Sequence, residues 1–143
     1  MIDQSALYEQ RVTIRDDSDL VIARQRIREI GARVGLPESA IEAIATAATE
    51  IARNIVIHAH RGELVIGAIT QSDRSGLEVI ARDDGPGIAD VGAAMTDGYS
   101  TKGSLGLGLP SARRLVDEFE IQTRIGAGTT VVLRKLSRCE GRR

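Results

Sequence analysis

Glu50 and Asn54 are the first residues of this sequence whose types and spacing could do chemistry. They lie in the segment TEIARNIVIHAH, residues 49–60, and side chains four residues apart share one face of a helix. A carboxylate buried among alanines and isoleucines is costly unless a cation compensates it. The Asn carbonyl oxygen is a suitable ligand for Mg²⁺, which often takes few protein ligands beside phosphates and waters. The pair indicates a cation site, while a solvent-exposed helix flank would explain the same two residues.

A second candidate lies in ARDDGPGIAD, residues 81–90. A β-like run ends there in two aspartates, Asp83 and Asp84, and turns sharply through Gly85 and Gly87. Glycine permits positive φ and a close approach of the backbone to a ligand. A carboxylate at the end of the strand could accept a hydrogen bond from an exocyclic amine. An ordinary Asp-Gly-Pro-Gly turn is the alternative interpretation.

A third candidate is the glycine-rich stretch STKGSLGLGLPSARRL, residues 100–115. Gly103, Gly106 and Gly108 precede or open a predicted helix, where free backbone N–H groups and the helix dipole favour an anion. Lys102 adds a mobile positive charge. The stretch matches neither the Walker A loop nor the dinucleotide-binding fingerprint. A flexible loop before a helix would also explain it.

Hydrophobic periodicity predicts the elements that position these three segments. Apolar residues recur at spacings of three and four along the helical stretches, and β-rich runs joined by polar turns indicate antiparallel hairpins. The expected order is a strand at 8–14, helices at 19–34 and 37–59, strands at 63–70 and 76–83, a loop at 84–104, a helix at 106–118, and strands at 119–125 and 129–136. Helices on one face of a mixed, mainly antiparallel sheet define an α+β fold, a two-layer α/β sandwich.

Length and composition are those of one ordinary globular domain. The 143 residues are 42% hydrophobic and 27% charged, which predicts a single domain, 1–143, with a core at about 8–136 and a flexible basic tail at 137–143. A net charge of −1 and an aromatic content of 2% predict no nucleic-acid or membrane partner. The single cysteine, Cys139, and the polar N-terminus favour a cytoplasmic location.

The order of the three motifs resembles that of the GHKL ATPases, the Bergerat-fold superfamily. In that superfamily, E-x-x-x-N on a helix precedes D-x-G-x-G-I after a strand, and G-x-L-G-L-G-L then opens a helix. The matching residues are Glu50, Asn54, Asp83, Gly85, Gly87, Ile88, Gly103 and Leu105 through Leu109. GAGTT, residues 126–130, is also similar to the G-x-G-T that ends these folds, so the resemblance covers about residues 8–135.

The resemblance implies that ATP binds between the helices and a glycine-rich lid. Glu50 would be the general base, and Asn54 would ligate Mg²⁺. Asp83 would accept a hydrogen bond from the adenine amino group, with Thr129 preferred over Thr130 as support for a water there. Backbone N–H groups near Gly106 and Gly108 would hold phosphates, helped by Lys102. The full cofactor-binding set implied is Asn54, Asp83, Gly85, Gly87, Ile88, Lys102, Gly103, Leu105, Gly106, Leu107, Gly108, Leu109 and Thr129.

Within the superfamily, the chain is similar to small stand-alone kinases. The box E-I-A-R-N-I, residues 50–55, favours the RsbT-like serine/threonine switch kinases over the anti-sigma branch. This resemblance implies transfer to a Ser or Thr of a STAS-domain protein in a partner-switching stress pathway, that of the stressosome, and binding to a PP2C-type phosphatase. One alternative is an anti-sigma factor that sequesters a sigma factor and phosphorylates an anti-anti-sigma factor. Another is a nucleotide-gated adaptor with little turnover, against which the presence of Glu50 argues.

Overall fold

The computed structural model describes residues 9–88 and 108–138. Its elements are β1 (Gln10–Ile14), α2 (Asp17–Val34), α3 (Glu38–Asn54), a π-helical turn (Ile55–Ala59), β2 (Gly62–Gln71), β3 (Arg74–Asp83), α5 (Leu109–Leu115), β4 (Glu118–Arg124) and β5 (Gly128–Arg138). Within the described ranges, this order agrees with the one predicted from periodicity. Most of the predicted loop at 84–104 and the start of the predicted helix at 106–118 lie outside those ranges.

The five strands form one sheet in the order β1-β2-β3-β5-β4, and all neighbouring pairs are antiparallel. Both predicted hairpins, β2–β3 and β4–β5, are therefore correct, and the pairing of β3 with β5 joins them. That pairing sets Asp83 opposite Thr129 at one end of the sheet. Directly opposed residues of paired strands point to the same face. The strand register thus brings together two candidate residues that are far apart in the sequence.

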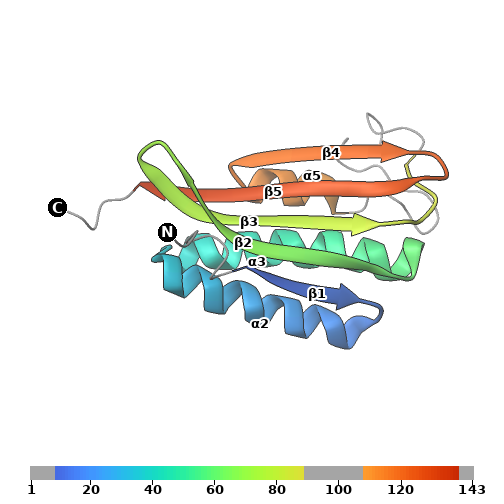
Figure 1. Ribbon diagram of the computed structural model, residues 1–143, viewed down its shortest axis with the longest axis horizontal. Coiled ribbons are helices and arrows are strands. Elements are labelled where there is room, and N and C mark those ends of the chain that lie inside the picture. The colour runs from blue at the N-terminus through green and yellow to red at the C-terminus, as the bar shows by residue number, and fades with distance from the viewer. Residues whose placement is uncertain (1–8, 89–107, 139–143) are drawn as a thin grey trace, which may run out of the picture.

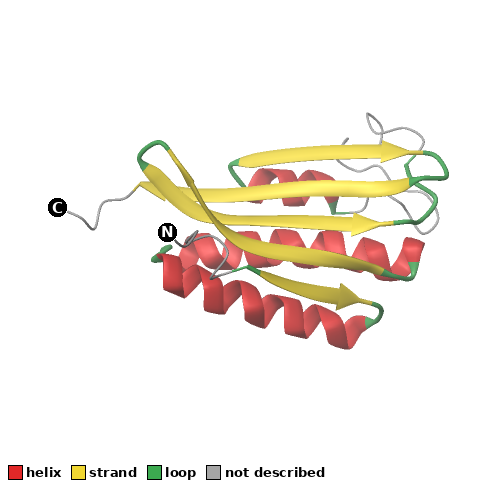
Figure 2. Ribbon diagram, viewed as in Figure 1, coloured by secondary structure: helices red, strands yellow, loops and turns green. Residues whose placement is uncertain are grey.

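The helices cover one face of the sheet, as Figure 1 and Figure 2 show. Between the two layers lies a core of fully buried aliphatic side chains, each of which contributes about 1.5–3 kcal/mol relative to an exposed position. The largest of them are Ile14, Ile27, Ile30, Ile44, Leu64, Ile66, Leu77, Leu109, Leu133 and Val79. This arrangement confirms the predicted two-layer α+β fold, although the sheet predicted to be mixed is antiparallel at every described strand pair. Among the helices in the described ranges, none is both long enough and apolar enough to span a membrane.

Helix α2 starts at a capping box and ends at a glycine. The Asp16 carboxylate accepts a hydrogen bond from the Ser18 N–H at 3.0 Å, and the buried Asp19 carboxylate accepts one from the Asp16 N–H at 3.3 Å. Gly35 ends the helix in the left-handed conformation at φ 81°. Pro37 then precedes α3. Gly35 and Pro37 together determine where α3 begins. Helix α3 then carries Glu50 and Asn54 towards the end of the sheet where Asp83 lies.

Three predicted boundaries are wrong. The helix predicted at 37–59 is α-helical only to Asn54 and continues as the π-helical turn. The helix predicted to end at 118 ends at Leu115, because Val116 is extended and leads into β4. Strand β5 continues to Arg138, into the segment predicted as a tail, because its last residues still pair with the start of β3.

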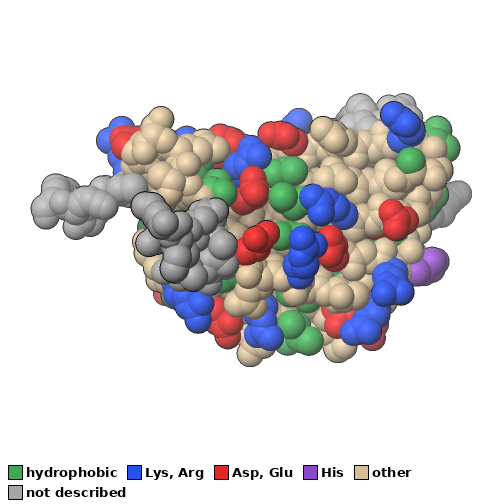
Figure 3. All heavy atoms as spheres, viewed as in Figure 1, with side chains coloured by type: hydrophobic (Ala, Val, Ile, Leu, Met, Phe, Trp, Pro, Cys, Tyr) green, Lys and Arg blue, Asp and Glu red, His purple; other side chains and the backbone are tan. Residues whose placement is uncertain are grey.

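The uncovered face of the sheet carries interspersed acidic and basic side chains (Figure 3). Arg134 of β5 lies among three carboxylates, at 2.8 Å from Glu78, 2.9 Å from Glu118 and 3.1 Å from Glu120. The Arg134 side chain is only 21% exposed, so these ion pairs are less screened than fully exposed ones, which contribute about 0–1 kcal/mol each. We infer that this network chiefly keeps the open face solvated, while packing against the helices holds the sheet in place.

Candidate active site

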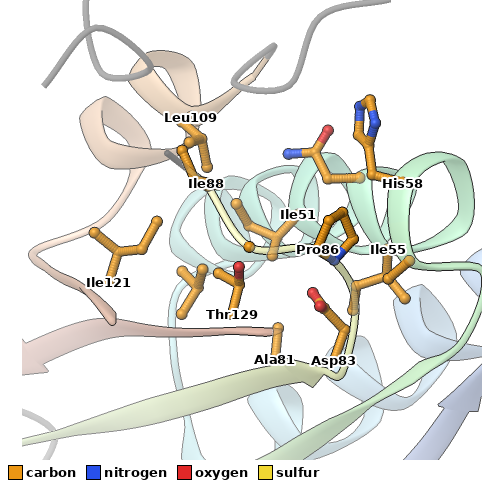
Figure 4. A pocket seen from close by; sticks show the side chains of 14 residues that line it. Ile51, Ile55, His58, Ala81, Asp83, Pro86, Ile88, Leu109, Ile121 and Thr129 are labelled. Atoms are coloured by element: carbon orange, nitrogen blue, oxygen red, sulfur yellow. The ribbon is translucent and has the colours of Figure 1, made fainter. Parts of the chain in front are cut away.

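A cleft opens between α3 and the end of the sheet, and the space within and in front of it, open solvent included, is about 490 Å³. Its lining residues are Ile51, Asn54, Ile55, His58, Ala59, Ala81, Asp83, Pro86, Gly87, Ile88, Leu109, Ile121, Thr129 and Val131 (Figure 4). Most of these side chains are apolar, with a few polar groups among them, which is typical of a small-molecule site. Of the candidate residues, the cleft brings together Asn54, Asp83, Gly87, Ile88, Leu109 and Thr129.

Glu50 lies outside the set of residues that line this cleft. Its side chain is 36% exposed, and its Oε1 atom is 3.9 Å from Nη1 of Arg53. The argument that a buried carboxylate needs a cation is therefore wrong for Glu50, which sits on a partly exposed flank of α3. The carboxylate instead lies against the start of α5, because a Cβ built on Gly108 would come within 2.7 Å of Oε1. Helix α3 thus carries Asn54 in the cleft wall and Glu50 beside α5.

The π-helical turn is a feature that the sequence analysis missed. It follows directly after Asn54, spans Ile55–Ala59 and ends at His60, whose φ is 69°. Widened helical turns of this kind are rare and frequently occur at functional sites. The turn places His58 in the cleft wall, and the Nε2 atom of His58 is buried without a hydrogen-bond partner in the described structure. Apolar periodicity does not distinguish such a turn from a continued α-helix, so no signal in the sequence could have revealed it.

Asp83 is the half-buried carboxylate of the cleft. It ends β3, and Figure 4 shows its side chain and that of Thr129 pointing into the cleft from the sheet. Burial raises the pKa of the Asp83 carboxyl, although the backbone N–H groups of Gly85 and Thr129 act in the opposite direction. The Gly85 N–H donates to Oδ1 at 2.8 Å, so Gly85 holds the carboxylate rather than lining the cleft. The carboxylate is thus oriented by backbone N–H groups on both sides of the cleft end, and it faces the cleft.

The turn after Asp83 is fastened to the β4–β5 hairpin. Gly87 adopts φ 79°, and a Cβ there would collide with the carbonyl of Arg124. The Ile88 N–H donates to Thr123 Oγ1 at 2.9 Å, and that hydroxyl lies 2.9 Å from Thr129 Oγ1. Thr123 therefore links the turn to Thr129, a role that the sequence analysis missed. Only the strand pairing reveals it, because Thr123 is opposite Thr129 in the sheet.

The glycine-rich segment is only partly described. Gly108 precedes α5 with φ 86°, and Leu109 is buried in the cleft wall. The other candidate residues of this segment lie outside the described residues, so their predicted contacts with phosphates remain predictions. They are Lys102, Gly103, Leu105, Gly106 and Leu107.

Both the fold and the arrangement of this site are those of a nucleotide-binding ATPase domain. Residues 14–135 match the family described as the histidine kinase-like ATPase domain, and the chain belongs to that family. The resemblance to the GHKL ATPases that the three motifs indicate is thereby confirmed.

Individual relatives show which members of the family this chain resembles. The chain is 40% identical over 131 residues to the serine/threonine-protein kinase RsbT of Bacillus subtilis (strain 168), covering 92% of this chain and 95% of RsbT. It is 33% identical over 97 residues to the anti-sigma F factor of Halalkalibacterium halodurans, covering 64% of this chain and 66% of that protein. It is 31% identical over 119 residues to the anti-sigma F factor of Caldanaerobacter subterraneus subsp. tengcongensis, covering 79% of this chain and 82% of that protein.

A solved structure shares the fold. The crystal structure of the RsbU and RsbW domains of a Mycobacterium tuberculosis protein matches with a TM-score of 0.59 and 24% sequence identity. The match covers 90% of this chain but only 33% of that one. This likeness supports the two-layer architecture and does not bear on activity.

Proposed function

We propose that this protein is an ATP-dependent serine/threonine protein kinase of the RsbT type. The observation that carries the proposal is the arrangement of α3, which holds Asn54 in the cleft wall while Glu50 lies beside the start of α5. Glu50 then stands at the edge of the cleft, where an acceptor hydroxyl could meet a bound nucleotide. The similarity to RsbT over 92% of the chain supports the same activity.

The residues present fit ATP. The cleft offers the Asp83 carboxylate and the Thr129 hydroxyl to the polar edge of a purine, and apolar walls to its ring faces. The backbone at Gly87 packs so closely on Arg124 that only glycine fits there. Among the described residues the buried Nε2 of His58 has no hydrogen-bond partner, and a ligand could supply one. When bound, ATP supplies the phosphoryl group that is transferred. We propose Asp83, Thr129, Gly85, Gly87 and Ile88 as the contacts and supports for the base.

The remaining roles complete the proposed mechanism. Asn54 would offer its carboxamide oxygen to Mg²⁺, and the segment from Lys102 to Leu109 would hold the phosphates. Phosphoryl transfer depends mainly on positioning and charge neutralisation. Glu50 would orient the acceptor hydroxyl and accept its proton, as a general base does. The partial exposure of Glu50 suits this role, because a protein acceptor must be able to reach it.

The acceptor that we propose is a serine or threonine of a STAS-domain protein. The chain would then exchange that partner for a PP2C-type phosphatase, as in partner switching at a stressosome. It would act in the cytoplasm as a single domain with its core at about 8–136. The similarity to RsbT and to anti-sigma F factors supports a partner-switching role. That similarity also favours a second candidate function, an anti-sigma factor that binds a sigma factor and phosphorylates an anti-anti-sigma factor.

The test of the kinase function is transfer from radiolabelled ATP and Mg²⁺ to a purified STAS-domain protein from the same genome. We expect label on the STAS protein that survives acid and is removed by alkali, because phosphoserine and phosphothreonine behave in this way. Acid-labile label, or label confined to the kinase itself, would contradict the proposal. Capture of a sigma factor by the immobilised protein, lost on addition of the STAS protein, would favour the anti-sigma function instead.

Replacement of Gly108 by alanine is expected to reduce transfer severely. Its φ of 86° already disfavours a side chain, and a Cβ there would displace the Glu50 carboxylate. Gly126 is the matched control, because its φ is 81° yet a Cβ there would meet nothing within 4 Å. Backbone strain should therefore cost both variants a similar stability, about 1–2 kcal/mol, in thermal unfolding. Equal transfer by G108A and G126A would show that the contact between Gly108 and Glu50 does not matter.

A further inference from the structure

Two exposed side chains follow Glu50 along the outside of α3 and the π-helical turn. The Arg53 side chain is 48% exposed, and Ile57 is 52% exposed. Neither residue lines the cleft, although their neighbours Asn54, Ile55 and His58 do. Arg53 and Ile57 therefore lie outside the nucleotide cleft, and Arg53 is beside the partly exposed Glu50.

Ile57 is unusual for its exposure. It is one of four large hydrophobic residues that the described part of the chain leaves exposed, and the only one of them on α3 or the π-helical turn. Single exposed aliphatic residues are common on protein surfaces. The position of this one distinguishes it, because it lies one turn beyond Arg53 on the segment that carries the proposed base.

Arg53 is a cation whose hydrogen-bonding groups are largely unused by residues 9–88 and 108–138. In the described structure its carboxylate contact is with Glu50, at 3.9 Å between Nη1 and Oε1. That separation exceeds hydrogen-bond range, so the attraction is electrostatic and leaves the guanidinium donors to solvent. A guanidinium in this state is suited to bind a carboxylate of another molecule through two parallel hydrogen bonds.

The geometry points to a docking surface for the protein acceptor, formed by Arg53 and Ile57. This inference rests on the proposed kinase function, because an acceptor hydroxyl must reach Glu50 while the cleft holds the nucleotide. The acceptor polypeptide then lies over the exposed flank of α3 beside Glu50. Charge complementarity to Arg53 requires an acidic side chain near the acceptor Ser or Thr, and Ile57 requires an apolar one. The partner surface is thus an acidic and apolar patch that surrounds the acceptor hydroxyl.

The test measures transfer from ATP to a purified STAS-domain protein from the same genome, at varied acceptor concentration, with variants R53A, R53K and I57D of the full chain. Removing a charged contact or the apolar anchor should raise the KM for the acceptor about tenfold or more. R53K keeps the charge but not the planar pair of donors, so it should raise the KM less than R53A does and should not restore the wild-type value. The affinity for MgATP should change little, because neither side chain lines the cleft. A docking role also requires that the kcat at saturating acceptor is largely kept.

The chain contains a matched control for R53A and another for I57D. Arg26 and Glu29 form another exposed helical pair, three residues apart with 3.8 Å between Nη1 and Oε1, so R26A removes the same kind of contact elsewhere. Ile125 is 71% exposed on the β4–β5 turn, so I125D introduces the same charge elsewhere. Both controls should leave the KM for the acceptor unchanged. Raised salt should weaken acceptor binding by the wild type more than by R53A, since salt screens the lost charge pair.

The possible outcomes distinguish a failure of this inference from a failure of the proposed kinase function. If the wild type transfers phosphate and the KM of R53A and I57D stays within about twofold of its value, the docking surface is wrong and the kinase function stands. If kcat falls while the KM is unchanged, Arg53 acts on Glu50 and not on the acceptor, which also overturns the inference. If I57D instead dissociates a dimer in analytical ultracentrifugation with the KM unaltered, Ile57 belongs to a self-association surface. Absence of transfer by the wild type itself overturns the kinase function and this inference with it.

Discussion

The Glu50→Ala variant is expected to bind MgATP normally yet to lose transfer to the protein acceptor. Glu50 lies outside the residues that line the cleft, so its removal leaves the nucleotide contacts in place. A general base typically contributes about 10²–10⁴-fold to a rate, and the loss of transfer should fall in that range. The measurements are the single-turnover rate of phosphoryl transfer and the affinity for a fluorescent ATP analogue.

The Glu50→Gln variant sharpens this test. It keeps the size of the side chain beside Gly108 and removes the negative charge, and with it the ability to accept a proton. If E50Q retains the wild-type rate, Glu50 is not the base. Thr46 supplies the control, because it lies one turn earlier on α3, outside the cleft lining. T46A should transfer phosphate at close to the wild-type rate.

The Asp83→Asn variant is expected to lose most of its affinity for ATP. The substitution replaces a charged acceptor by a neutral amide and removes about 1.5–3 kcal/mol, roughly a 10- to 150-fold weakening. The matched control is D84N, since Asp84 is adjacent to Asp83, exposed and outside the cleft lining. Isothermal titration with MgATP measures both variants, and equal affinity for D83N and the wild type would remove Asp83 from the base-binding site.

The D83N substitution, which weakens ATP binding, should not weaken the folding stability of the protein without nucleotide. Burial raises the pKa of Asp83 above its ordinary value of 3.8, so the folded protein holds this proton more tightly than the unfolded chain does. The resulting contribution to stability is fully present below the ordinary pKa and is lost as the pH rises through the raised pKa of the folded state. At neutral pH the ionised carboxylate is therefore unfavourable without a ligand.

Thermal unfolding at several pH values checks this sign. At neutral pH without nucleotide, D83N should melt at the same temperature as the wild type or higher. Relative to D83N, the wild type should gain stability as the pH falls towards the ordinary pKa of an aspartate. A wild type that loses stability relative to D83N over that range would contradict the effect of burial. A variant that is stable yet does not bind ATP would mark Asp83 as a residue retained for function.

Several features of this protein followed from its sequence because they are local. The spacing of Glu50 and Asn54 places both on α3, and Asp83 ends its strand at a Gly-Pro-Gly turn. Helix and strand periodicity, together with glycine and proline punctuation, specify such features within one element. The hairpins β2–β3 and β4–β5 are equally local, because each joins strands through a short turn. For this reason the two-layer fold and the family could be predicted from the order of the motifs.

The remaining features depend on contacts between distant segments. The pairing of β3 with β5 sets Asp83 opposite Thr129, and that of β4 with β5 sets Thr123 beside it. The packing of α5 on α3 brings Gly108 against Glu50, and the π-helical turn directs His58 into the cleft. Neither residue type nor local spacing encodes these relations, because they depend on which strands become neighbours and how tightly the layers pack. The sequence by itself determined the local elements and the candidate residues that they carry, and only the tertiary structure decided which of these residues meet.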